Sequence, residues 1–246
     1  MTDIPADDYK IDLRGDITVE LVKSSATDSD VLFAARVSTV GEQSLDELKK
    51  DPERSKGLIN YLMRDRHGSP FEHNSMTFFI SAPIFVFREF MRHRVGWSYN
   101  EESGRYRELQ PVFYVPGAER KLVQQGRPGK YVFVEGTAEQ HELVSRSMED
   151  SYREAYRTYQ EMLAAGIARE VARAVLPVGL YSSMYATCNA RSLMHFLGLR
   201  TQHELAKVPS FPQREIEMVG EKMEEEWARL MPLTYAAFNA NGRVAP

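Results

Sequence analysis

The hydrophobic and polar positions of this chain change their spacing several times, which predicts both strands and helices. Residues 17–22 alternate in polarity and are rich in β-branched side chains, as in a strand that buries one face. Residues 76–80 and 178–187 are also predicted to be strands, because they are short runs dominated by apolar and aromatic side chains. These segments supply the strands of a small sheet.

Helical spacing is clearest after residue 136. Thr137 and Gln140 form a capping-box pattern, in which each side chain bonds the backbone of the other residue, and Gly166 fits the end of the helix. Apolar and aromatic side chains recur every three or four residues between these ends: Leu143, Val144, Met148, Tyr152, Tyr156, Tyr159, Met162 and Leu163. We expect this stripe in the core or at a subunit interface rather than against a cofactor.

The same criteria predict six further helical regions. They are residues 30–37 capped by Asp30, 44–64 beginning at a capping box of Ser44 and Glu47, 83–95 with Pro83 in the first turn, 168–176, 190–202 capped by Asn189, and 213–230. Residues 117–136 are rich in Gly, Lys and Gln and are predicted to be an exposed, mobile loop. Helices and scattered strands without a regular βαβ alternation predict an α+β fold, with long helices packed on a small mixed or antiparallel sheet.

Composition narrows the class of protein. The 246 residues are 43% hydrophobic and 27% charged, which excludes a disordered chain. Cys188 is the single cysteine, so an internal disulfide framework and a cysteine-based zinc site are excluded and a reducing compartment is favoured. The acidic residues 1–8 lack the features of a signal peptide, and the apolar stretch 76–87 is too short to span a bilayer. We expect a cytoplasmic protein with no membrane segment.

The familiar sequence devices for nucleotides, metals and hydrolysis are missing. There is no G-x-G-x-x-G, P-loop, G-x-S-x-G, H-E-x-x-H or C-x-x-C pattern. The six histidines are dispersed, so we expect solvated or core histidines and no metal site. The net charge of −4 argues against a duplex-DNA binder.

An arginine-rich segment is the strongest chemical signal. Residues 83–107 hold five arginines, three glutamates and His93. Arg92, His93 and Arg94 are costly to bury together without anions, so they are solvated, paired or in contact with an anionic ligand. Residues 98–106 then add hydroxyls, an amide, carboxylates and Gly104, which suit a nucleotide-like ligand held partly by guanidinium groups.

A second polar group lies much further along the chain. Its members are Glu170, Arg173, Asn189, Arg191, His195 and Arg200, on segments that otherwise look buried. Its three arginines could contact the same ligand as the arginine-rich segment. The alternative interpretation is that each is a helix-terminal charge or forms an ion pair with Glu170 or Glu204.

Several separated motifs resemble the flavin-dependent thymidylate synthases. The family pattern is Arg-His-Arg, seven residues, then Ser, and here residues 92–94 are followed by Ser-Tyr-Asn-Glu-Glu-Ser-Gly-Arg-Tyr at residues 98–106. Eight residues separate Arg94 from Ser103, one more than in the family, most simply placed at Gly96 and Trp97. The resemblance extends from residues 67–73 and 82–86 through 169–177 to 189–194 and 199–200.

The resemblance implies a fold of the thymidylate synthase-complementing type and the methylation of dUMP to dTMP. In that reaction 5,10-methylenetetrahydrofolate gives the carbon, FAD relays hydride and NADPH reduces the flavin. The resemblance also implies a homotetramer whose active sites are built from more than one subunit, with no nucleic acid, membrane or metal as partner. Because the motifs spread from His67 to Arg200, we expect one domain over residues 1–246. The rival hypothesis is a non-catalytic RNA- or nucleotide-binding protein that uses the same arginines.

Matching positions assign the site residues. The residues expected around FAD are His67, Ser69, Arg92, His93, Arg94, Glu101, Asn189, Arg191 and His195. The residues expected around the nucleotide are Glu89, Phe90, Met91, Arg92, Glu101, Glu102, Ser103, Gly104, Arg105, Arg173 and Arg200. Some relatives carry an amide at the positions of Glu89 and His195.

Carbon 5 of uracil is a poor nucleophile until electron density is pushed onto the ring. Cys188 lies in a strand-like run without a nearby base, so we expect a buried thiol that takes no part. Arg200 matches the arginine of the family's Leu-Arg. It is expected to be catalytic, because a guanidinium beside N3 and the adjacent carbonyl favours the ionised form of the uracil ring. Ser103 is expected to contact the ligand rather than to form a covalent bond, because no paired histidine base is evident.

Overall fold

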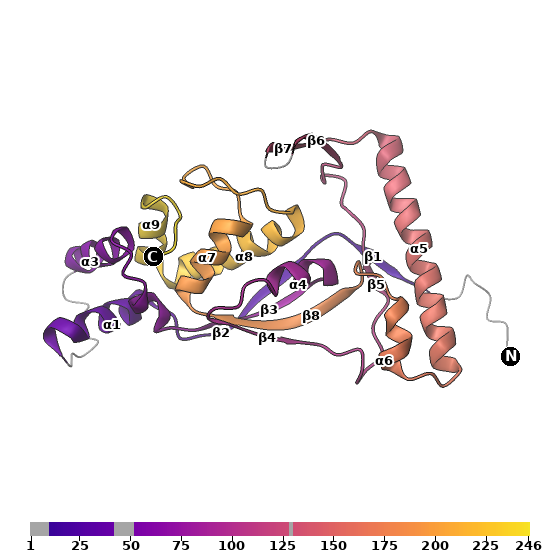
Figure 1. Ribbon diagram of the computed structural model, residues 1–246, viewed down its shortest axis with the longest axis horizontal. Coiled ribbons are helices and arrows are strands. Elements are labelled where there is room, and N and C mark those ends of the chain that lie inside the picture. The colour runs from indigo at the N-terminus through magenta and orange to yellow at the C-terminus, as the bar shows by residue number, and fades with distance from the viewer. Residues whose placement is uncertain (1–9, 42–51, 128–129) are drawn as a thin grey trace. The chain divides into compact units, whose positions relative to one another are not determined.

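The computed structural model describes residues 10–41, 52–127 and 130–246 (Figure 1). The chain forms two compact units. The first unit contains Met1–Asp16, Ser81–Arg88 and Glu101–Ser183, and the second contains Ile17–Ile80, Glu89–Asn100 and Met184–Pro246. The expectation of one domain stays a prediction.

In the first unit, a long helix packs against a short parallel pair of strands. Strand β1 (Asp12–Arg14) pairs with β5 (Val112–Tyr114), and α5 (Ala138–Ala164) is followed by the short helix α6 (Arg169–Ala172) and the 3₁₀ turn η2 (Arg173–Val175). The tyrosine stripe of α5 is buried in this core, where Tyr152 stacks on Phe113 with 4.8 Å between the ring centroids. From Met148 onward the stripe is therefore core, one of the two predicted places, whereas Leu143 near the start of the helix is exposed. The capping box of Thr137 and Gln140 is confirmed.

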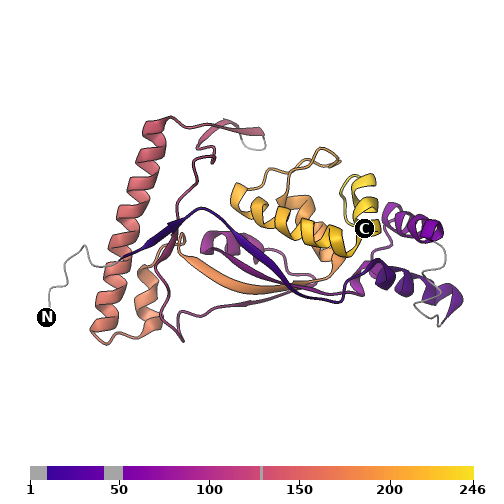
Figure 2. The same ribbon diagram turned by 180° about the vertical axis from the view of Figure 1, so that it is seen from behind.

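The second unit holds most of a four-stranded sheet and the remaining helices. The strand order is β2 (Thr18–Ser24), β3 (Met76–Pro83), β8 (Tyr181–Cys188) and β4 (Trp97–Glu101), and β3 and β8 contribute residues to both units. The helices are α1 (Asp28–Val40), α3 (Pro52–Arg64), the 3₁₀ turn η1 (Ser69–Glu72), α7 (Ala190–Arg200), α8 (Arg214–Leu230) and α9 (Pro232–Ala240). Figures 1 and 2 show α7, α8 and α9 packed side by side. The predicted α+β class is correct.

The helix predicted at residues 83–95 is shorter than expected. Pro83 is the last residue of β3, and α4 (Ile84–Phe90) ends at Phe90. The backbone then turns, because the Tyr99 hydroxyl shares its hydrogen between the carbonyl oxygens of Phe90 at 3.0 Å and His93 at 2.8 Å, and Gly96 has φ +69°. The prediction that Arg92 lies on a helix was wrong: residues 91–96 form a turn between α4 and β4.

Other boundaries also differ from the predictions. Asp30 was expected to cap its helix, but Thr27 is the N-cap and Asp30 is the third residue of a capping box. Residues 117–136 are exposed over much of their length, yet they include the antiparallel pair β6 (Val123–Arg127) and β7 (Lys130–Val134). The capping box predicted at residues 44–47 lies outside the described residues. The Asn189 cap is confirmed, since its side chain accepts a hydrogen bond from the backbone of Ser192, whereas α9 was not predicted.

Across the described ranges, no helix is both long enough and apolar enough to cross a membrane.

Candidate active site

Arg200, the last residue of α7, is held by two side chains of the segment that follows β3. Its Nη1 donates to Oε2 of Glu89 at 2.5 Å, and its Nε donates to Nε2 of His93 at 3.1 Å. Glu89 lies near the end of α4 and His93 in the turn after it. We call Glu89, His93 and Arg200 the Arg200 cluster. In the part of the chain that the structure describes, Nη2 is the guanidinium nitrogen of Arg200 that has no partner.

The environment of His93 keeps its imidazole neutral. Burial, together with the positive charges of Arg200 and His195, lowers the pKa of His93 to about 4. Aromatic rings cause part of this burial, with Phe196 at 4.9 Å and Trp97 at 6.4 Å between ring centroids. A neutral imidazole can accept a hydrogen bond from a guanidinium, whereas an imidazolium cannot. His93 is therefore an acceptor in this cluster at neutral pH.

We expect the His93 ring signals, followed by NMR, to titrate near pH 4 rather than near the ordinary value of 6.5. Above pH 6.5 the folded and unfolded chains both carry neutral His93. Between pH 6.5 and 4 only the unfolded chain takes up the proton, so folding stability falls as the pH is lowered through this window. An Arg200→Ala variant removes one cause of the shift and is expected to raise the His93 pKa. A midpoint near 6.5 in the parent protein would contradict the geometry.

Arg191 anchors the loop that contains His67 and Ser69. Its Nη1 donates to Oε1 of Glu72 at 2.5 Å, and its Nε donates to the carbonyl oxygen of Pro246 at 2.6 Å. The guanidinium lies against Gly68 so closely that an added Cβ there would be 2.5 Å from Cζ of Arg191. Two of the residues expected around FAD, Ser69 and Arg191, therefore belong to adjoining elements of the second unit.

The two arginines of the Arg-His-Arg motif, and Arg88 on α4, carry charge that is available to a ligand. Arg88, Arg92 and Arg94 are exposed, and none of them forms an ion pair with another residue in the described ranges. A phosphate or pyrophosphate group is the kind of ligand that such guanidinium groups bind.

The first unit holds the other residues expected around the nucleotide. Glu101 accepts a hydrogen bond from Ser182 at 2.8 Å, and burial raises the pKa of its carboxyl group, an effect that Glu102 increases and Arg173 opposes. Gly104 is buried where an added Cβ would be 3.2 Å from Cδ of Arg173. Arg173 is thus close to Gly104 and to the carboxyl group of Glu101, although it lies 69 and 72 residues further along the chain.

The alternative interpretation, that the distant arginines form ion pairs, is correct in part. Arg191 pairs with Glu72 and Arg200 with Glu89, rather than with Glu170 or Glu204. Glu170 instead pairs with Arg105 at 2.9 Å, and both of these side chains are about half exposed. An exposed pair of this kind is weak, so the Arg105 guanidinium can exchange its partner for a ligand.

The predicted site residues divide between the units. The second unit holds His67, Ser69, Glu89, Phe90, Met91, Arg92, His93, Arg94, Asn189, Arg191, His195 and Arg200, and the first holds Glu101, Glu102, Ser103, Gly104, Arg105 and Arg173.

Three of the predicted residues have structural surroundings of their own. The Phe90 side chain is fully buried and stacks on Phe196, with 4.7 Å between the ring centroids, so only its backbone can contact a ligand. Asn189 uses its side-chain oxygen to cap α7. Burial, together with the charge of Arg191, lowers the pKa of His195.

Sequence reasoning missed the residues that support this site. Glu72 holds Arg191, Ser182 holds Glu101 and Tyr99 fixes the turn of His93. Tyr99 stands inside the motif that carried the resemblance, which was a usable signal. Glu72 likewise stands inside residues 67–73, which belong to the resemblance, whereas nothing local in the sequence marked Ser182.

Metal-ligating side chains and the Cys188 thiol were the other candidates for chemistry in the described ranges. No group of three metal-ligating side chains occurs among the described residues. Cys188 is 2% exposed, and burial raises the pKa of its thiol. The prediction that Cys188 is buried is confirmed, and that it takes no part in the reaction stays a prediction.

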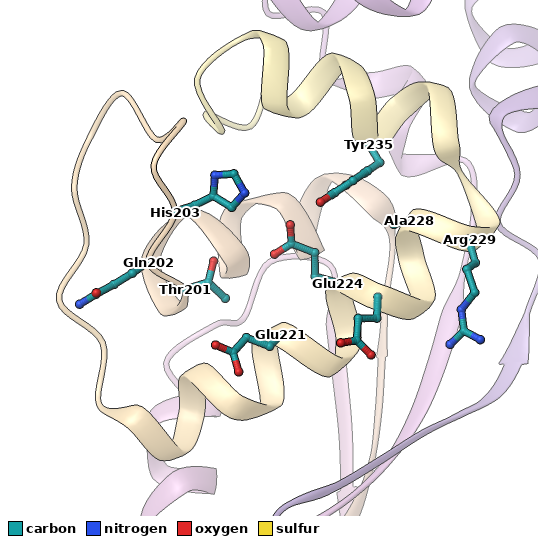
Figure 3. A pocket seen from close by; sticks show the side chains of 9 residues that line it. Thr201, Gln202, His203, Glu221, Glu224, Ala228, Arg229 and Tyr235 are labelled. Atoms are coloured by element: carbon teal, nitrogen blue, oxygen red, sulfur yellow. The ribbon is translucent and has the colours of Figure 1, made fainter. Parts of the chain in front are cut away.

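A pocket of about 730 Å³ lies on the second unit between α8, α9 and the segment after α7 (Figure 3). It is lined by Thr201, Gln202, His203, Glu221, Glu224, Glu225, Ala228, Arg229 and Tyr235, and none of the predicted site residues is among them. Glu224 forms a buried ion pair with Arg243, and Nη2 of Arg243 donates to the Thr201 hydroxyl at 3.2 Å. This wall of the pocket therefore anchors the residue that directly follows Arg200.

The model of the thymidylate synthase complementing protein family matches residues 20–233. The chain belongs to this family. It is 92% identical over 246 residues to the flavin-dependent thymidylate synthase of Streptomyces coelicolor, with all of both chains covered. The enzyme of the same name from Tropheryma whipplei is 60% identical over 233 residues, which cover 94% of this chain and 95% of the relative.

A solved structure of a relative has the same fold as this chain. The structure of the UMP/dUMP methylase PolB from Streptomyces cacaoi bound with 5-Br dUMP matches with a TM-score of 0.90 and 59% sequence identity. The match covers 96% of this chain and 100% of that chain.

Proposed function

We propose that this protein is a flavin-dependent thymidylate synthase, which methylates dUMP reductively to dTMP. In this proposal 5,10-methylenetetrahydrofolate donates the carbon and becomes tetrahydrofolate, and FAD relays hydride from NADPH. The observation that carries the proposal is the 92% identity, over the whole chain, to a protein named for this activity. In this proposal the residues described above would supply the groups that the reaction needs.

The donor set of the second unit suits FAD. The cofactor carries a pyrophosphate, and Arg92 and Arg94 offer exposed guanidinium groups that are not paired with any carboxylate of the described residues. His67, Ser69, His93, Asn189, Arg191 and His195 of the same unit would complete its surroundings. Bound FAD would supply the hydride-transfer chemistry that no side chain can provide.

Arg200 is proposed to activate the uracil ring. A guanidinium beside N3 and the adjacent carbonyl favours the form in which negative charge is spread over the ring, and this raises the electron density at carbon 5. The free Nη2 is the nitrogen that can make this contact, since Nε and Nη1 are bound to His93 and Glu89. In the first unit, Arg105 and Arg173 would balance the charge of the nucleotide phosphate.

A Cys188→Ser variant is expected to keep most of its turnover. The thiol is fully enclosed and its pKa is raised, so it cannot present a thiolate to carbon 6 of uracil. The measurement is dUMP-dependent tritium release from carbon 5, compared with the parent protein at equal FAD content. A folded, FAD-loaded variant without turnover would show that the thiol takes part.

We also propose that the protein is a cytoplasmic homotetramer in which more than one subunit contributes to each active site. Light scattering behind size-exclusion chromatography tests the tetramer directly.

Colour and turnover test the main proposal against a non-catalytic nucleotide-binding protein. Purified protein should be yellow, should lose flavin absorbance on addition of NADPH, and should release tritium from carbon 5 of dUMP when methylenetetrahydrofolate is present. UMP should be offered in parallel, because the PolB relative is named for both nucleotides. Colourless protein that FAD cannot reconstitute would refute the proposal.

A further inference from the structure

We propose that Glu89 is a positioning residue, which holds the Arg200 side chain so that Nη2 is the nitrogen presented to the substrate. This inference deepens the proposed function and rests on it. The carboxylate acts through Arg200, and in this proposal that role takes the place of the direct contact with the nucleotide that was expected for Glu89.

The two contacts of Arg200 restrict its guanidinium in different ways. Glu89 binds Nη1 at the tip of the side chain at 2.5 Å, and His93 binds Nε, next to the aliphatic part, at 3.1 Å. With only one of these contacts, the planar guanidinium could rotate about that contact. Two contacts on different nitrogens fix both its position and its plane, which is how a guanidinium gains directional specificity.

Partial burial makes the Glu89 contact stronger than an ordinary surface ion pair. The side chains of Arg200 and Glu89 are 22% and 26% exposed, compared with 53% for each partner of the Arg105 and Glu170 pair. Charges screened less by water attract each other more strongly. Glu89 is therefore the contact that dominates the hold, and the neutral His93 completes it.

The backbone of Arg200 is fixed independently of its side chain. Thr201 bonds to the Leu197 carbonyl through its backbone at 3.0 Å and through its hydroxyl at 2.8 Å, and Arg243 donates to the same hydroxyl. Loss of Glu89 should therefore release the guanidinium without unwinding the end of α7. This separation lets a Glu89 variant report on positioning rather than on folding.

The test uses full-length, FAD-loaded protein and four variants: Glu89→Ala, Glu89→Gln, Arg200→Ala and the Glu89→Ala/Arg200→Ala pair. Glu221→Ala is the matched control, because it removes a carboxylate from an arginine ion pair on α8. We measure kcat and KM by tritium release, the Kd for dUMP by titration, and the His93 pKa by NMR in the protein without nucleotide.

Glu89→Ala is expected to lower kcat by about 10- to 100-fold, the effect of misplacing a catalytic group. Glu89→Gln keeps an oxygen acceptor but loses the charge, so its kcat should lie between those of Glu89→Ala and the parent protein. The double variant should bind dUMP no more weakly than Arg200→Ala alone, because Glu89 has nothing left to position. The His93 pKa should rise in Glu89→Ala, since the guanidinium charge has moved away, should rise less in Glu89→Gln, and should stay low in Glu221→Ala.

Two outcomes would overturn the inference. One is a double variant whose loss of dUMP affinity is the product of the single losses, which would mean that Glu89 contacts the nucleotide independently. The other is an unchanged His93 pKa in Glu89→Ala. If the parent protein releases no tritium, the proposed function fails, whereas the His93 titration still decides whether Glu89 holds Arg200.

Discussion

Arg200→Ala is expected to lose methylation while the protein remains folded and yellow. The guanidinium is the proposed source of positive charge at the uracil ring, and removal of one such electrostatic donor costs about 10²–10³-fold in kcat in other enzymes. FAD should stay bound, because its expected phosphate ligands, Arg92 and Arg94, are separate exposed side chains. Tritium release and the flavin spectrum, measured on the same sample, check both halves of the result.

Arg229→Ala provides the control for Arg200→Ala. Arg229 is an exposed arginine of α8 that pairs with Glu226 on the same helix, so its removal deletes a charge at a residue outside the predicted site. It should leave turnover unchanged. Colourless Arg200→Ala protein would assign this arginine to the cofactor instead, and yellow protein with normal turnover would remove it from the mechanism.

Arg243→Met is expected to cause the largest loss of stability, about 3–5 kcal/mol in the free energy of unfolding. The Arg243 side chain is 1% exposed and that of its partner Glu224 is 13% exposed. The substitution leaves the Glu224 carboxylate largely buried without its cation, and it also removes the contacts that Arg243 makes with Asn239 and Thr201. Urea unfolding followed by circular dichroism measures the loss.

The companion variants separate charge from packing. Arg214→Met breaks an arginine ion pair on the same helix as Glu224, but the Arg214 side chain is 42% exposed, so its effect should be small. Arg243→Met/Glu224→Leu removes both charges and should recover part of the stability, since no unpaired charge remains. An Arg243→Met protein as stable as its parent would show that the pair contributes nothing.

Features fixed by neighbouring residues could be predicted from the sequence. The start of α5 depends on Thr137 and Gln140, three residues apart, and its buried face on tyrosines spaced three and four apart. The end of α4 was misplaced because Tyr99, nine residues beyond Phe90, binds its carbonyl oxygen. The β6–β7 pair was missed because β6, Val-Gln-Gln-Gly-Arg, lacks an apolar pattern and contains Gly126 with φ +95°. The apolar residues of β7, Lys-Tyr-Val-Phe-Val, were a strand signal that was passed over.

The same limit applies to the candidate site. The residue types and the motif order predicted which positions to expect, and likeness to the family supplied their roles. The partners could not be predicted, because Arg191 and Glu72 are 119 residues apart and Arg200 and Glu89 are 111 apart. No spacing rule connects residues at such separations, so the ion-pair partner of each arginine can be identified only from the folded structure.

The contact between Gly68 and Arg191 has a consequence for how this family can vary. A side chain at position 68 would displace the guanidinium from Glu72, since Cζ and Nε of Arg191 would both lie 2.5 Å from the new Cβ. Positions 68, 72 and 191 are therefore constrained to change together. Homologues that keep an arginine at position 191 should keep glycine at position 68. Residues other than glycine should occur at position 68 only in relatives that have replaced this arginine.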